Sequence, residues 1–138
     1  MSDIAREVRG RRVVSLVVDD YADARATVRD LLEELGHEVI EAENGQQAFD
    51  FVIANPHVSV QLIVLDLKMP VMNGWEFLAL MRSYVRLSRI PIVVVSGNAS
   101  SLKPNETLAL AGCLQVPYEL PKLRAIVGSI NAPPSSST

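Results

Sequence analysis

The stretch LIVLDLKMPVMNG, residues 62–74, decides the fold. It begins with an unbroken apolar run that ends at Asp66, and Pro70 and the pair Asn73-Gly74 follow. An apolar run without alternation is typical of a strand buried on both faces, and Pro and Asn-Gly mark a turn. The stretch therefore predicts a central strand that ends at Asp66, at the sheet edge where open α/β folds bind ligands.

A single Asp in such a place is more often a turn residue than a functional one. A second apolar run, VVSLVV at residues 13–18, also ends in carboxylates, Asp19 and Asp20. Two strands that both end in carboxylates favour a site over a turn.

Composition limits the class of protein. The chain has 138 residues, 49% of them apolar and 21% charged, which is ordinary for one globular domain with its own core. The net charge of −3 does not favour a nucleic-acid or membrane partner. The single cysteine, Cys113, excludes an internal disulfide, and no membrane span or signal peptide is evident. We expect a cytoplasmic protein.

Strand and helix patterns alternate five times along the chain. The expected strands are 13–19, 37–42, 62–66, 90–95 and 113–116; the expected helices are 21–35, 47–54, 74–85, about 101–111 and 120–130. Such alternation predicts a doubly wound parallel sheet with helices on both faces, in the flavodoxin-like strand order 2-1-3-4-5. We expect a basic flexible arm at 1–12, one domain at 13–130 and a disordered Pro/Ser-rich tail at 131–138. His37 and His57 are expected in surface loops.

In this strand order the first and third strands are neighbours. Asp19, Asp20 and Asp66 should therefore converge, with Ser96 contributed by the end of the fourth strand. Clustered carboxylates repel one another unless a cation is present, and Mg²⁺ prefers oxygen ligands and phosphate partners. A carboxylate can also act as a nucleophile toward phosphorus. The cluster thus predicts a magnesium and phosphoryl site.

These motifs together resemble the receiver domain of two-component response regulators. The resemblance is carried, in order, by Asp19-Asp20, Asp66, Met69-Pro70, Asn73-Gly74, Ser96-Gly97 and Val116-Pro117-Tyr118. It covers nearly the whole chain, and because no output domain follows, the closest type is a single-domain, chemotaxis-regulator-like receiver.

The resemblance implies a role for each site residue. Asp66 would accept a phosphoryl group from a histidine kinase or a histidine phosphotransfer protein. Asp19, Asp20, Asp66 and the backbone carbonyl of Lys68 would hold Mg²⁺, and Ser96 would be the switch hydroxyl. The protein would then signal to a downstream target protein and not act as an enzyme, apart from slow self-dephosphorylation. Homodimerisation stays open.

One position departs from the family pattern. A lysine that precedes the proline of the fifth-strand motif is replaced by Val116, so we expect phosphotransfer to survive better than switching. Lys68, Lys103 and Lys122 are candidate substitutes.

Three other kinds of protein share parts of this pattern. The main one is a receiver-like interaction module that works without phosphorylation. A flavodoxin-like cofactor binder is disfavoured by the acidic loop at residues 19–23, and a haloacid-dehalogenase-type phosphatase by Lys68 where a second Asp is expected.

Overall fold

The computed structural model describes residues 13–104, 110–117 and 120–131. The predicted arm at 1–12 lies outside the described residues, and so does the predicted tail apart from Asn131. No helix in the described ranges is long and apolar enough to cross a membrane.

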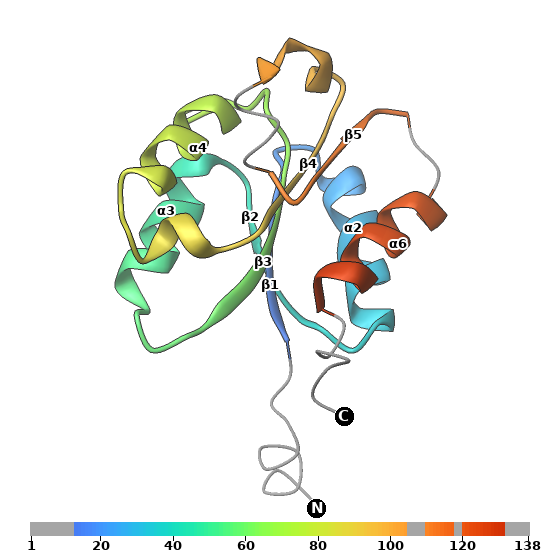
Figure 1. The fold of residues 1–138 in the computed structure, drawn as a ribbon, viewed down its shortest axis with the longest axis horizontal. Coiled ribbons are helices and arrows are strands. Elements are labelled where there is room, and N and C mark those ends of the chain that lie inside the picture. Colours follow the sequence, from blue (N-terminus) through green and yellow to red (C-terminus); the bar gives the residue numbers. More distant parts are fainter. Residues whose placement is uncertain (1–12, 105–109, 118–119, 132–138) are drawn as a thin grey trace, which may run out of the picture.

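The five predicted strands form one sheet (Figure 1). They are β1 (Val14–Val18), β2 (Glu38–Ala42), β3 (Val60–Leu65), β4 (Ile92–Ser96) and β5 (Gly112–Gln115). All neighbouring strands are parallel, in the order β2-β1-β3-β4-β5. This confirms the predicted flavodoxin-like order and places β1 beside β3.

Helices cover both faces of the sheet. The described helices are α2 (Ala22–Glu34), α3 (Gly45–Ala54), α4 (Gly74–Arg82) and α6 (Leu120–Asn131), with two short 3-10 helices, η1 (Leu87–Arg89) and η2 (Ala99–Ser101). In Figure 1, α3 and α4 lie on one side of the sheet and α2 and α6 on the other. The short strand-to-helix connections are those of a doubly wound fold.

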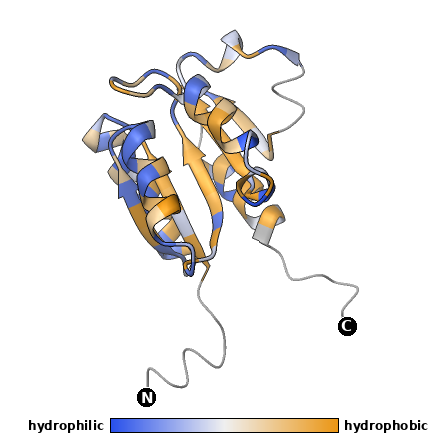
Figure 2. Cartoon of the chain, turned by 90° about the vertical axis from the view of Figure 1, so that its left-hand side faces the viewer, coloured by the Kyte–Doolittle hydropathy of each residue, from blue (hydrophilic) through white to orange (hydrophobic). Residues whose placement is uncertain are grey.

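Each central strand supplies both cores. Leu16, Ile63 and Val94 pack in a cluster with residues of α3 and α4, whereas their neighbours in sequence pack with α2 and α6. This double burial explains why the strands are continuous apolar runs and not alternating ones. Figure 2 shows the result, with hydrophobic strands inside and hydrophilic residues on the outer helix surfaces.

Some element boundaries differ from the prediction. The helix expected to reach about residue 85 ends at Arg82, where the chain continues to η1. Ser101 lies in η2, Leu110 and Ala111 are not helical, and residues 105–109 of the expected fourth helix lie outside the described part. Gly112 was expected to end that helix but begins β5, where a Cβ atom would meet Ile126 Cγ2 of α6 at 2.8 Å.

The prediction that His37 lies in a surface loop is wrong. The residue is 5% exposed, and its Nδ1 atom lies 2.6 Å from the hydroxyl of Ser15, which is fully buried in β1. Burial lowers the pKa of the His37 imidazole. The pair lies near the start of β1 and β2, away from the edge where the strands end in carboxylates.

Candidate functional site

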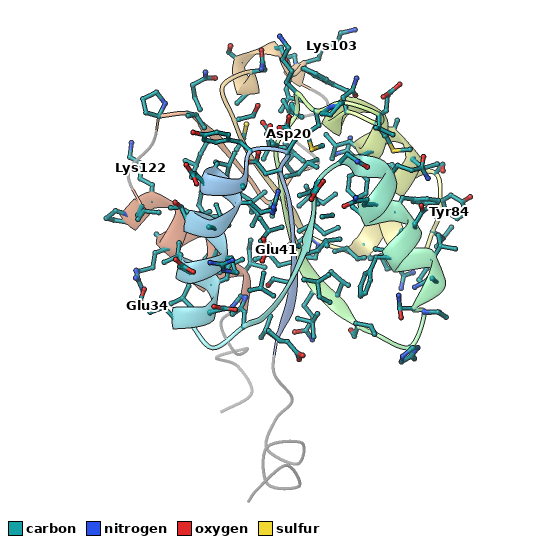
Figure 3. All side chains as sticks on the ribbon, turned by 180° about the vertical axis from the view of Figure 1, so that it is seen from behind. Asp20, Glu34, Glu41, Tyr84, Lys103 and Lys122 are labelled. Atoms are coloured by element: carbon teal, nitrogen blue, oxygen red, sulfur yellow. The ribbon has the colours of Figure 1, made fainter. Side chains whose placement is uncertain are left out.

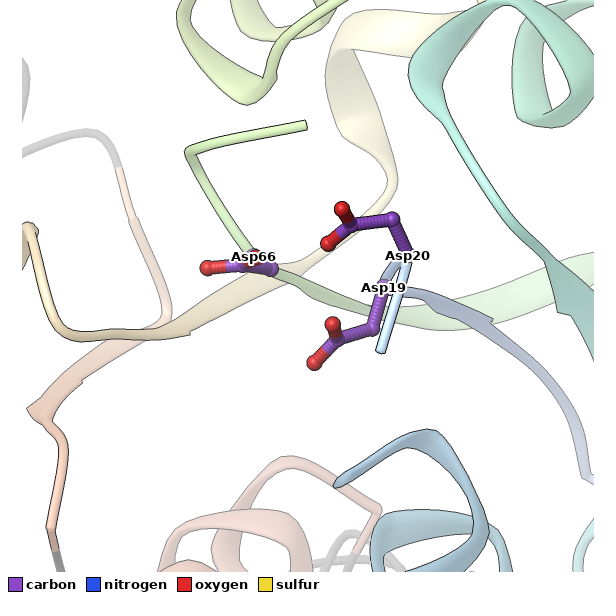
Figure 4. Close-up of side chains that lie close together, drawn as sticks. All are labelled: Asp19, Asp20 and Asp66. Carbon is purple, nitrogen blue, oxygen red and sulfur yellow. The ribbon is translucent and has the colours of Figure 1, made fainter. Parts of the chain in front are cut away.

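Three carboxylates meet where β1 and β3 end. Asp19 and Asp20 follow β1, and Asp66 follows β3. One oxygen atom of each lies within 4.8 Å of the others. Figure 4 shows the side chains next to one another, with Asp19 nearest to α2 and α6. The structure thus brings together the three acidic residues that the sequence predicted to converge.

Backbone hydrogen bonds hold this edge in register beyond the strands. The Asp66 amide donates to the Val18 carbonyl at 2.9 Å, and the Asp19 amide donates to the Ala42 carbonyl at 3.1 Å. Asp19 and Asp66 are therefore attached to backbone that is hydrogen-bonded to the sheet, which favours a defined ligand geometry.

The loop after β3 is closed tightly over Asp66. The Gly74 amide donates to the Leu67 carbonyl at 2.7 Å, and a Cβ atom at Gly74 would lie 2.5 Å from the Asp66 carbonyl oxygen. Asn73 caps α4 by accepting from the Glu76 amide, while Glu76 accepts from the Asn73 amide. The Asn-Gly pair of the sequence therefore joins the start of α4 to Leu67 and lies against the backbone of Asp66.

The Asp66 side chain is oriented by the next residue along the chain. Its Oδ1 atom accepts a hydrogen bond from the Leu67 amide at 2.8 Å. The side chain is half-buried, so its other oxygen is the one left to face a ligand.

Asp19 has a carboxyl group with a raised pKa. Burial raises the pKa of Asp19 to about 6, and the negative charges of Asp66 and Asp20 add to this rise. The Tyr21 amide, 3.0 Å from Asp19 Oδ1, and the Arg25 charge oppose it. A bound cation would stabilise the ionised form of the Asp19 carboxyl group.

Arg25 of α2 lies beside the cluster and was not singled out by the sequence analysis. Its side chain is only 14% exposed. Its Nη1 atom donates to the Asp19 carbonyl at 2.7 Å, and its Nε atom donates to Glu41 at 2.8 Å. The positive charge of Arg25 is thus paired with the carboxylate of Glu41. At the site, Arg25 contacts the backbone carbonyl of Asp19 and not its carboxylate. The sequence gives no sign of this position, because it does not show that Arg25 pairs with Glu41 on the neighbouring strand β2.

Ser96 is the last residue of β4, on the strand next to β3, and it is 1% exposed. Its Oγ atom accepts from the Asn98 amide at 3.1 Å. The loop that follows is held to β5 by Gln115, whose amide group donates to the Gly97 carbonyl at 2.6 Å and accepts from the Ser100 amide at 3.0 Å. We call these two hydrogen bonds the Gln115 clamp; the sequence analysis did not single it out.

The donor set fits a hard divalent cation. Carboxylate oxygens from three side chains are the ligands that Mg²⁺ prefers, and two of the three side chains are only half-buried, so water can complete the coordination. Lys68 is exposed in the loop after Asp66.

Val116 follows β5 beside Ser96. Its amide donates to the Ser96 carbonyl at 3.1 Å, and its side chain is 43% exposed. The candidate substitutes Lys68, Lys103 and Lys122 are all exposed. Figure 3 shows Lys103 beyond the sheet edge that carries Asp20, and Lys122 on the outer side of α6.

Comparisons with known proteins agree with this geometry. A family model described as "response regulator receiver domain" matches residues 15–127. The "Chemotaxis protein CheY homolog" of Campylobacter jejuni is 38% identical over 82 residues, which cover 59% of this chain and 62% of that protein. The "Autoinducer 1 sensor kinase/phosphatase LuxN" of Vibrio campbellii is 33% identical over 124 residues, which cover 89% of this chain and 14% of that protein. The chain thus spans less than two thirds of the length of both relatives.

A solved structure shows the same fold. The response regulator TrrA of Thermotoga maritima, in complex with Mg²⁺-BeF, superposes with a TM-score of 0.73 at 23% identity, covering 86% of this chain and 98% of that one. The strand order, the acidic cluster and the family match over most of the chain agree, and the protein belongs to the response regulator receiver domain family.

Proposed function

We propose that Asp66 accepts a phosphoryl group in a magnesium-dependent reaction and that the protein signals in this form. The observation that carries the proposal is the convergence of three carboxylate oxygens within 4.8 Å at the end of β1 and β3. The Leu67 amide holds one oxygen of Asp66, which leaves the other available as the nucleophile.

The reaction is a simple displacement at phosphorus. An Asp66 carboxylate oxygen forms a bond to phosphorus while the bond to the leaving group breaks, and the leaving group keeps the electron pair. The leaving group is the imidazole of a phosphohistidine in a kinase or phosphotransfer protein, or acetate when acetyl phosphate is the donor. Asp19 and Asp20 take no part in bond formation; they bind the cation with Asp66 and the carbonyl of Lys68.

Mg²⁺ bound by these residues supplies the positive charge that lets a carboxylate approach a phosphoryl group. Without a cation, three carboxylates would repel the incoming phosphate. Ser96, at the end of the adjacent strand, is the hydroxyl that we assign to sensing the new phosphoryl group.

Val116 is expected to alter signalling more than phosphorylation. A valine places no positive charge beside the product, so the phosphorylated form should persist for less time and switch less completely. A Val116→Lys variant should extend the phosphoryl lifetime or raise affinity for the target protein. A variant unchanged in both properties would count against this part of the proposal.

The partners that we propose follow from the chemistry. A histidine kinase or phosphotransfer protein supplies the phosphoryl group, a downstream target protein reads it, and the protein works in the cytoplasm where such kinases present their phosphohistidine. The similarity of part of LuxN, named a sensor kinase/phosphatase, supports a place in a kinase pathway.

The test is intact mass after incubation with acetyl phosphate and Mg²⁺. A phosphate adduct is expected on the native chain, no adduct without Mg²⁺ and none on Asp66→Asn. Asp50→Asn is the matched control, because Asp50 lies on α3 outside the cluster.

The competing function is an interaction module that works without phosphorylation. The observation in its favour is the exposed apolar side chain of Val116 at the position of the family's lysine. It becomes the better account when neither acetyl phosphate nor a phosphotransfer protein produces an adduct on Asp66.

A further inference from the structure

A pocket of about 420 Å³ extends from the acidic cluster down the α2 and α6 side of the sheet. One end is formed by Asp19 and Asp66. The walls are formed by β1, β3, β4 and α2 and by the segments that follow β4 and β5. The lining residues include Val17, Val64, Val95, Val116, Tyr21 and Leu120. A mostly apolar pocket of this size with a few convergent polar groups is the usual form of a ligand site.

The charged side chains among the described lining residues of the pocket are all acidic. Among its described lining residues, Asp19 and Asp66 carry charge and none is basic. Figure 4 shows the Asp19 carboxylate on the side of the cluster that faces α2 and α6. The nearest arginine, Arg25, is paired with Glu41 and reaches Asp19 through its backbone carbonyl.

The charge balance leaves room for a second cation. Three ionised carboxylates exceed the charge of one divalent ion by one unit, and a phosphoryl group on Asp66 would increase this excess. The exposed part of the lining is also apolar. It consists of the side chains of Tyr21, Val116 and Leu120, which are 63%, 43% and 42% exposed. A ligand that matches both ends has a cationic head and a short apolar stem.

We propose that this pocket binds an alkylammonium group, with the ammonium at Asp19 and Asp66 and the alkyl chain along Val17, Val64 and Val116. The group has two sources, a free small amine or a lysine side chain presented by a partner protein. In either case the cation that this chain lacks at position 116 is supplied from outside. The proposal deepens the proposed function, since it concerns the same acidic site.

The experiment is a methyl NMR titration of the full, unphosphorylated chain with n-butylammonium chloride in the presence of Mg²⁺ and at constant ionic strength. Saturable shifts are expected for Val17, Val64 and Val95, and none for Val52 and Val60, which lie in the core on the α3 and α4 side. n-Butanol should bind about tenfold more weakly or worse, because it lacks the charge-assisted contact. Equal binding of both compounds, or no saturable shift, would overturn the proposal.

Two variants separate charge from space. Val116 is exposed, so Val116→Lys and Val116→Gln should both fold, and the two new side chains are similar in length. Val116→Lys should abolish n-butylammonium binding by placing its own ammonium at the carboxylates, whereas Val116→Gln should retain most of it. Equal loss in both variants would contradict a charge-driven site.

A third arm identifies the source of the ammonium. Nα-acetyl-lysine methylamide carries the same group on a peptide backbone. Binding of both probes supports a partner's lysine, and binding of n-butylammonium alone supports a free amine. Because the readout uses unphosphorylated protein, its failure is distinct from a failure of Asp66 to accept a phosphoryl group.

Discussion

At the scale of single residues, Val71 has a backbone conformation that L-amino acids rarely adopt. It is the one non-glycine residue in the described chain with a positive φ, at 69°, and it lies in the loop between Asp66 and α4 with 78% of its side chain exposed. A β-branched residue in this conformation costs about 1–2 kcal/mol. The strain lies five residues beyond the proposed phosphoacceptor.

Val71→Gly should therefore stabilise the protein. Relief of the left-handed strain outweighs the greater freedom of glycine in the unfolded chain, so we expect a gain of about 0.5–1 kcal/mol in the free energy of unfolding. Urea denaturation measures it. Val85→Gly is the control, because Val85 is equally exposed at 75% and has no positive φ; it should be neutral or destabilising. A loss of stability in Val71→Gly would show that the loop gains more from the valine than it loses.

Asp19 makes a second prediction at this scale, for the pH dependence of stability without Mg²⁺. Its pKa is raised from 3.8 to about 6 in the folded state, so between these values the folded chain binds more protons than the unfolded chain. The free energy of unfolding should then fall as pH rises through this window. Asp19→Asn should flatten that slope and be more stable than the native chain above pH 6.

Urea denaturation at several pH values in a chelator checks this prediction. Asp50→Asn, on α3, should keep the native slope. Identical slopes for the native chain and Asp19→Asn would mean that the site relaxes and lets water reach the carboxylate.

At the scale of elements, the Gln115 clamp joins β5 to the loop that follows Ser96. Gln115→Ala should remove both hydrogen bonds while leaving the backbone bond from Val116 to Ser96 in place. We expect faster hydrogen exchange at the Ser100 amide and a loss of about 1 kcal/mol in stability.

The exchange should change only in the segment from Gly97 to the end of η2. Gln46→Ala is the matched control, because Gln46 makes one exposed side-chain bond to Asp50 within α3. Unchanged exchange at Ser100 would show that the loop keeps its conformation without the clamp.

Elements with a strong local pattern were predictable from the sequence. The strands ending at Asp19 and Asp66 are apolar runs closed by carboxylates, and their pairing followed from the alternation of strands and helices. Because Asp19, Asp20 and Asp66 directly follow these strands, predicting the strands also predicted where the three residues lie. The order of the strands in the sheet and the convergence of the three carboxylates could therefore be predicted from the sequence alone.

Contacts between distant segments were not predictable in the same way. The burial of His37 depends on Ser15, 22 residues earlier, and the clamp depends on bonds from Gln115 to residues 15 and 18 positions away. Gly112 was read as a helix end, although its lack of a side chain serves close packing against Ile126 of α6. Local sequence carries no signal for such pairs.

At the scale of the whole molecule, the acidic cluster links metal binding to global stability. If Mg²⁺ binds the folded site, as we propose, and not the dispersed carboxylates of the unfolded chain, it should raise the melting temperature. At a concentration 100 times its dissociation constant the gain is about 2.7 kcal/mol. Thermal melts with increasing MgCl₂ measure this effect.

Asp20→Asn should reduce the metal-dependent gain because it removes one of the three carboxylates. It should leave the fold intact, because Asp20 is the most exposed of the three. Asp30→Asn, on the outer surface of α2, is the control and should respond to Mg²⁺ as the native chain does. A melting temperature that does not depend on Mg²⁺ would contradict the metal site.

The pairing of β1 with both β2 and β3 has a consequence for synthesis on the ribosome. These three strands and all three carboxylates come from residues up to Asp66, so they emerge from the exit tunnel before β4, β5 and Ser96 emerge. A nascent chain of that length already contains the metal ligands and three adjacent strands to hold them. The cation site can thus form while the segment that would sense a phosphoryl group is still inside the exit tunnel.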